Sequence, residues 1–154
     1  MNKLPQVETA KALMTEAMGW SVMKWLREKK KVRKTADLAN AALDQMSESV
    51  KARWPDGLRD AYAGLAATSG SAVRGQEKQA SEAMDPETKL VAKKIKEADD
   101  AAYRARMDAE KSFDDAEKQL STSLAREGCR KAIHGWELHE KAIRMAEAAI
   151  PQVE

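Results

Sequence analysis

Apolar residues recur at alternating steps of four and three positions from Met18 to Val50. This heptad spacing is typical of a helix whose apolar seam packs against another helix. Lys29 is the only charged member of the series, which otherwise comprises Met18, Val22, Trp25, Val32, Ala36, Ala39, Leu43, Met46 and Val50. No proline interrupts residues 7–54, and Pro55-Asp56-Gly57 favours a turn. The pattern therefore predicts a helix over about residues 7–54.

The second half of the chain contains a second long helical pattern. Residues 58–67 fit a short helix, and the small, glycine-containing stretch 68–84 is typical of a linker. Asp85-Pro86 is a helix start signal, because aspartate favours the N-cap and proline the first helical position. Apolar spacing then continues to about residue 150, and Gly128 and Gly135 predict a kink or break near 128–135. A helix over about 86–150 is expected.

The seam of this second helix is rich in alanine, which lets two helix axes approach closely. Together the two patterns predict an all-α chain, a single domain over residues 1–154, built on a long antiparallel, coiled-coil-like helical hairpin. Charge agrees with that arrangement. Residues 24–34 contain seven basic side chains against Glu28, and the segment expected opposite them, 106–116, contains Asp108, Glu110, Asp114 and Asp115.

Both long helices carry more apolar surface than one neighbour covers. On the first the surplus centres on Met18, Val22 and Trp25, and on the second it comprises Trp136, Ile143 and Ile150. We expect these residues to form an interface, by fold-back or by dimerisation, that completes a three- or four-helix bundle. The predicted partner is a second copy of the chain or another helical protein.

The composition bears on where in the cell the protein is expected. Charged residues make up 34% of the chain, aromatic residues 5%, and the net charge is +2. A single cysteine gives no disulfide framework, and no continuous apolar stretch is long enough for a membrane span. These features predict a cytoplasmic protein without a transmembrane segment.

A basic run after Trp20 and Trp25 is the clearest candidate binding surface. Its cations are Arg27, Lys29, Lys30, Lys31, Arg33 and Lys34. Clustered cations bind nucleic acid or anionic membranes, and flanking tryptophans suit a lipid headgroup region. The simpler interpretation is a solvated helix face neutralised by acidic residues opposite, because the overall charge is near zero and no nucleic-acid-binding motif accompanies the run.

Candidates for catalysis or metal binding are few. Cys129, His134 and His139 are separated by steps of five residues, which place them on different faces of a continuous helix. We therefore predict no metal site, no cofactor and no catalytic residues. A pocket holding His134 or His139 beside a carboxylate is the arrangement that would indicate an enzyme. The sequence favours a non-enzymatic helical interaction protein, with polyanion or membrane binding through residues 20–34 as the alternative.

Overall fold

The computed structural model describes residues 3–66 and 85–151, which form α-helices and no strand. The prediction of an all-α chain is confirmed. The helices are α1 (Pro5–Ala17), α2 (Val22–Lys51), α3 (Asp56–Ala66), α5 (Pro86–Gln119) and α6 (Thr122–Ala148). The predicted linker, residues 68–84, lies outside the described residues. None of the helices in the described ranges combines the length and apolar character needed to cross a bilayer.

The predicted first helix, 7–54, is wrong as one continuous element. It is divided after Ala17 by a turn over Met18–Ser21, so that α1 folds back along α2. Ser21 begins the new helix, because its Oγ accepts a hydrogen bond from the backbone N–H of Lys24 (3.2 Å). The expected turn at Pro55 is confirmed, since α2 ends at Lys51 and α3 starts at Asp56.

The predicted second helix starts at Pro86 as expected, but its break is not near 128–135. The break lies at Leu120 and Ser121, and α6 runs without interruption through Gly128 and Gly135. Leu120 ends α5 in the left-handed conformation (φ 50°), which costs a side-chain-bearing residue about 1 kcal/mol or more. Ser121 then caps α6 by accepting a hydrogen bond from the N–H of Leu124 (3.2 Å).

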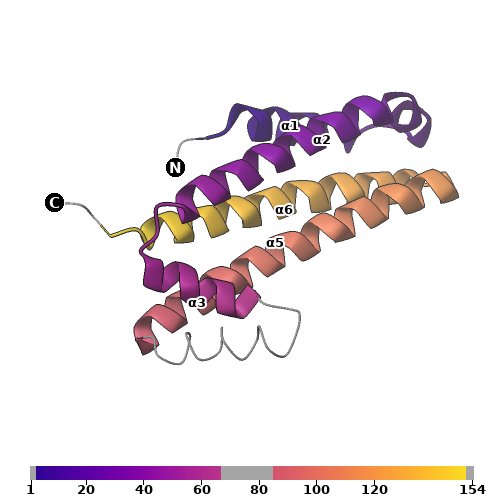
Figure 1. The fold of residues 1–154 in the computed structure, drawn as a ribbon. Coiled ribbons are helices and arrows are strands. Elements are labelled where there is room, and N and C mark those ends of the chain that lie inside the picture. The colour runs from indigo at the N-terminus through magenta and orange to yellow at the C-terminus, as the bar shows by residue number, and fades with distance from the viewer. Residues whose placement is uncertain (1–2, 67–84, 152–154) are drawn as a thin grey trace.

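Helix α6 is the centre of the molecule. It packs against α1, α2 and α5, while α3 packs against α5. Figure 1 shows α2 and α6 running in the same direction, with α5 opposite to both and the turn between α5 and α6 at one end of the molecule. Hydrogen bonds fix the parallel pair at both ends. At one end the N–H of Val22 donates to Thr122 Oγ1 (3.1 Å), and at the other Trp54 Nε1 donates to the Ala146 carbonyl (2.8 Å).

Three helices meet closely in the core near the turn between α5 and α6. The rings of Trp25 from α2 and Phe113 from α5 stack with centroids 5.7 Å apart, and both side chains are buried. Gly128 of α6 lies against the same phenyl ring. A Cβ placed at Gly128 would lie 2.6 Å from a Phe113 ring carbon, well inside van der Waals contact. The absence of a side chain at Gly128 therefore permits α6 to approach this stack.

Gly128→Ala should lower the free energy of unfolding by about 1–2 kcal/mol. Overpacking costs about 1–3 kcal/mol, offset by roughly 1 kcal/mol from the higher helix propensity of alanine. Gly135→Ala is the matched control in the same helix, since its added Cβ would meet Ala105 and the Arg106 backbone at 3.4 Å. It should be neutral or slightly stabilising. Urea titration followed by circular dichroism measures both; equal stability of the two variants contradicts this packing.

Candidate functional site

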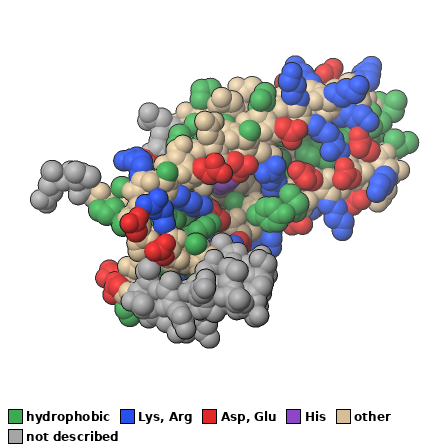
Figure 2. Space-filling view, in the orientation of Figure 1, with side chains coloured by type: hydrophobic (Ala, Val, Ile, Leu, Met, Phe, Trp, Pro, Cys, Tyr) green, Lys and Arg blue, Asp and Glu red, His purple; other side chains and the backbone are tan. Residues whose placement is uncertain are grey.

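A groove of about 500 Å³ separates α2 from α5 and has α6 as its floor. Figure 2 shows acidic and basic side chains along this face of the molecule. From α2 the lining comprises Arg33, Ala36, Asp37, Asn40, Asp44, Ser47, Glu48 and Lys51, and from α5 it comprises Lys96, Asp99, Asp100, Ala102, Tyr103, Arg106, Ala109, Glu110 and Phe113. Ala132, Gly135, Trp136 and His139 of α6 and Tyr62 of α3 complete it.

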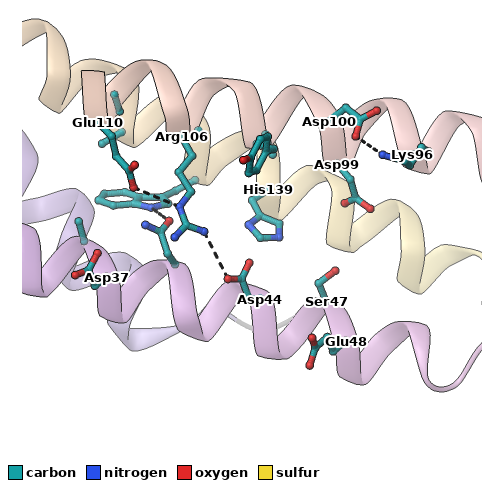
Figure 3. Close-up of a pocket in the computed structure, with 18 of the residues that line it drawn as sticks. Asp37, Asp44, Ser47, Glu48, Lys96, Asp99, Asp100, Arg106, Glu110 and His139 are labelled. Carbon is teal, nitrogen blue, oxygen red and sulfur yellow. Dashed lines mark hydrogen bonds and ion pairs between the residues drawn. The ribbon is translucent and has the colours of Figure 1, made fainter. Parts of the chain in front are cut away.

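Ion pairs bridge the groove between its two walls. Near the middle, Arg106 of α5 reaches across to Asp44 of α2 (3.6 Å), as Figure 3 shows. At one end Lys51 pairs with Asp99 (2.7 Å). At the other end Arg33 contacts Asp114 (2.9 Å). These ion pairs join the two walls at three places along the groove.

His139 lies on the floor of the groove, between the Arg106–Asp44 and Lys51–Asp99 ion pairs (Figure 3). Its ring points from α6 into the space between the two walls (Figure 3). Burial lowers the pKa of His139 below its usual value of 6.5, and the nearby Lys51 and Arg106 add to the lowering, whereas Asp44 and Asp99 oppose it. The imidazole is therefore neutral near pH 7 and can accept a hydrogen bond or a proton.

Asp99 is already held by two donors. Lys51 Nζ donates to its Oδ2 at 2.7 Å, and the Tyr62 hydroxyl donates to the same oxygen. Burial raises the pKa of Tyr62, and its hydrogen bond to Asp99 and the charges of Asp99 and Asp100 raise it further, so the phenol stays protonated. The Lys51 ammonium also lies 4.5 Å from the centre of the Tyr62 ring. This network gives the groove one rigid end.

Charge in the groove is not balanced among the residues that the structure describes. Each lining cation has a carboxylate partner: Arg33 with Asp114 and Glu117, Lys51 with Asp99, Lys96 with Asp100, and Arg106 with Asp44 and Glu110. Asp37 and Glu48, both exposed on the α2 rim, form no ion pair in the described part of the chain. The charge left for a ligand is therefore negative.

One polar atom without a hydrogen bond and several aromatic side chains also line the groove. In the described residues the buried Nε of Arg106 has no hydrogen-bond partner. Trp136 is buried in the floor, where its Nε1 donates to Asn40 Oδ1 (2.9 Å), and Phe113 is buried beside it, while Tyr103 is exposed on the α5 rim. Aromatic walls of this kind accommodate methylene chains and the faces of organic cations.

The residues expected to form an interface, by fold-back or by dimerisation, lie mostly inside the chain. Trp25, Trp136 and Ile143 are buried in the core, and Met18 and Ile150 pack against it while Val22 is half-buried. The apolar stripes therefore do not need a second chain to cover them, because α1, α2 and α6 cover one another.

The basic run is divided by the structure into two sets. Lys29 and Arg33 face α5 and pair with Glu117 at 2.8 and 3.2 Å. By contrast, Arg27, Lys30, Lys31 and Lys34 are exposed and have no ion pair within the described residues. The acidic segment expected opposite the run, residues 106–116, thus engages Arg33 through Asp114. Glu117, one residue beyond that segment, engages Lys29 as well as Arg33.

The three metal and nucleophile candidates lie in different surroundings along α6. Cys129 is buried, and burial raises the pKa of its thiol to about 12, so it is a poor nucleophile. His134 is exposed, and His139 lines the groove. No group of three metal-ligating side chains is found in the described ranges. Sequence reasoning missed the groove itself, although the polar residues at 37, 44 and 48 share one face of the helix.

Comparison with protein-family models, with curated proteins and with solved structures gave no significant match. The groove and the surface charge of the chain are therefore the features from which its function is inferred.

The lowered pKa of His139 predicts a specific pH dependence of stability. An unfolded chain binds a proton at His139 near pH 6.5, whereas the folded chain binds it only at lower pH. The stabilisation is therefore complete above that value and is lost as the pH falls through it towards the lower folded pKa. Wild type should lose more unfolding free energy between about pH 7 and pH 5 than His139→Gln. An exposed control, His134→Gln, should follow the wild type. If the unfolding free energies of the wild type and His139→Gln fall equally between about pH 7 and pH 5, His139 is not held as a neutral imidazole in the folded chain.

Proposed function

We propose that this chain is a non-enzymatic helical binding protein whose α2–α5 groove takes an elongated organic cation, such as a linear polyamine. The observation that carries the proposal is the pair of rim carboxylates without cations, Asp37 and Glu48, above a groove of about 500 Å³. The antiparallel pairing of the two long helical segments is part of the proposal. The ion pairs Lys29–Glu117, Arg33–Asp114 and Arg106–Asp44 support it.

The spacing of the two carboxylates matches a long ligand. Eleven residues along α2 separate Asp37 from Glu48, which corresponds to about 16 Å at 1.5 Å per residue. An extended linear tetraamine spans a similar distance between its terminal nitrogens. Its methylene segments would lie against Tyr103 and Trp136, and an inner ammonium would donate to the neutral His139 on the floor. Each group of such a ligand then meets a complementary group of the protein.

Binding of spermine, measured by isothermal titration calorimetry, tests the proposal. The double variant Asp37→Asn/Glu48→Gln should weaken binding by up to about 30-fold, because each exposed charge pair contributes up to about 1 kcal/mol and 1.4 kcal/mol is tenfold in affinity. Glu97→Gln/Glu137→Gln is the matched control. It makes the same change in net charge at exposed positions outside the groove lining, and it should bind like the wild type.

Equal weakening by both double variants would mean that spermine responds only to overall charge, and the groove would not be its site. If neither the wild type nor the variants give a heat of binding with spermine, linear polyamines are excluded as ligands.

His139 favours one second candidate, acid–base catalysis, because the groove places a neutral imidazole among carboxylates. General-base chemistry requires such a group within reach of a substrate proton. The two candidates differ in outcome. Prolonged incubation with an amine that binds should leave its proton NMR spectrum unchanged if the groove only binds, and a time-dependent product that His139→Gln abolishes would establish the enzyme instead.

A further inference from the structure

One end of the molecule is both basic and apolar. Residues 13–34 and 114–131, which meet there, contain 11 Lys and Arg against 6 Asp and Glu, giving +5, so that the rest of the chain carries −3. Hydrogen bonds hold the two segments together. The Val22 N–H donates to Thr122 Oγ1 (3.1 Å), and Arg126 Nε donates to the Met18 carbonyl (2.8 Å). The space-filling view shows hydrophobic side chains among basic ones at this end (Figure 2).

Two large apolar side chains at this end are exposed to solvent. Met23, in the first turn of α2, is 63% exposed, and Leu120, at the turn between α5 and α6, is 61% exposed. Neither is needed by the core, which Trp25 and Phe113 fill nearby. Trp20, which packs against the core, carries the Lys24 ammonium 5.0 Å from its ring centre. A helix end that only contacts water does not require exposed large apolar side chains beside basic ones.

Leu120 also has an unfavourable backbone conformation. Its φ of 50° suits glycine, and a leucine there is strained. Glycine at this turn would therefore give a more stable folded chain than leucine does. A leucine retained in a strained position with its side chain in solvent points to a role for the side chain outside the fold.

Exposed cations, together called the collar, continue along α2 from Met23 and end α5 next to Leu120. Lys24, Arg27, Lys31 and Lys34 follow one face of α2 at steps of three and four residues, and all are exposed. Lys118, in the last turn of α5, is exposed beside Leu120. Within the described residues none of these five has an ion pair. The six acidic residues of the same two segments reduce the positive charge without cancelling it: Glu16, Glu28, Asp114, Asp115, Glu117 and Glu127.

We propose that this end, comprising Met23, Leu120 and the collar Lys24, Arg27, Lys31, Lys34 and Lys118, is a peripheral binding surface for anionic lipid membranes. Lipid phosphates and serine headgroups complement the collar, and the boundary of the acyl chains takes the two apolar side chains. A nucleic acid would satisfy the cations, but its phosphate backbone offers no place for exposed Met23 and Leu120. The combined features therefore favour a membrane. The proposal does not depend on ligand binding in the groove.

Co-sedimentation with lipid vesicles tests the surface on the intact chain. We expect binding to vesicles of phosphatidylcholine with phosphatidylserine, weaker binding at high salt, and none to phosphatidylcholine alone. Met23→Ser/Leu120→Gly should lower vesicle affinity up to about 100-fold, since burial of each side chain contributes roughly tenfold. The same variant should unfold at the same or higher urea concentration than the wild type, because glycine relieves the strain at position 120.

A matched control is Leu90→Ser, which removes another exposed leucine (51%, against 61% for Leu120) from the start of α5, at the other end of that helix. It should bind vesicles like the wild type. Equal affinity of the wild type and Met23→Ser/Leu120→Gly for anionic vesicles would overturn the proposal. Equal binding to neutral and anionic vesicles would also overturn it. Salt-sensitive binding to duplex DNA without binding to vesicles would assign the collar to nucleic acid instead.

Discussion

The close approach of α6 to the Trp25–Phe113 stack is the constraint on which the rest of the structure depends. Gly128 permits that approach, because any side chain there would meet the phenyl ring. With α6 fixed at the centre, its other faces are free to bury Trp136 and Ile143 against α1 and α2. Lys11 of α1 completes the cover by pairing with the buried carboxylate of Glu140. A buried charge of this kind is stable only with a partner, so the pair also holds α1 in place.

The same constraint creates the groove. Because α6 lies between α2 and α5, these two helices flank it and are joined through long side chains such as Arg106 and Lys51. Their facing surfaces are therefore polar, with aromatic residues below, and water-accessible space remains between them. The burial of His139 follows from its place on the central helix, and its lowered pKa follows from that burial. The α2–α5 groove and the core thus both result from the central position of α6.

The sequence predicted the helical class and the boundaries that proline marks, at Pro55 and Pro86. It did not predict the reversal at Ser21, because a serine cap is a weak local signal that also occurs inside helices, and apolar spacing continues nearly unchanged across that turn. At the second reversal the spacing does slip, through Leu120 and Leu124, but the break was expected at the glycines that follow the slip. Gly128 and Gly135 were interpreted as a break, whereas both lie inside α6 and Gly128 permits its close packing against Phe113 of α5. The groove was missed for a different reason. The polar stripe of Asp37, Asp44 and Glu48 is visible in the sequence, but its opposition to α5 depends on the tertiary position of α6.

Two-dimensional NMR of the labelled chain titrated with spermine tests the central claim, that the α2–α5 groove is the binding site. The account predicts that backbone amide signals shift along residues 33–51 of α2 and 96–113 of α5, together with those around His139, while the amides of α1 stay in place. Saturable shifts centred anywhere else on the molecule, or shifts spread evenly over all exposed acidic residues, would contradict it.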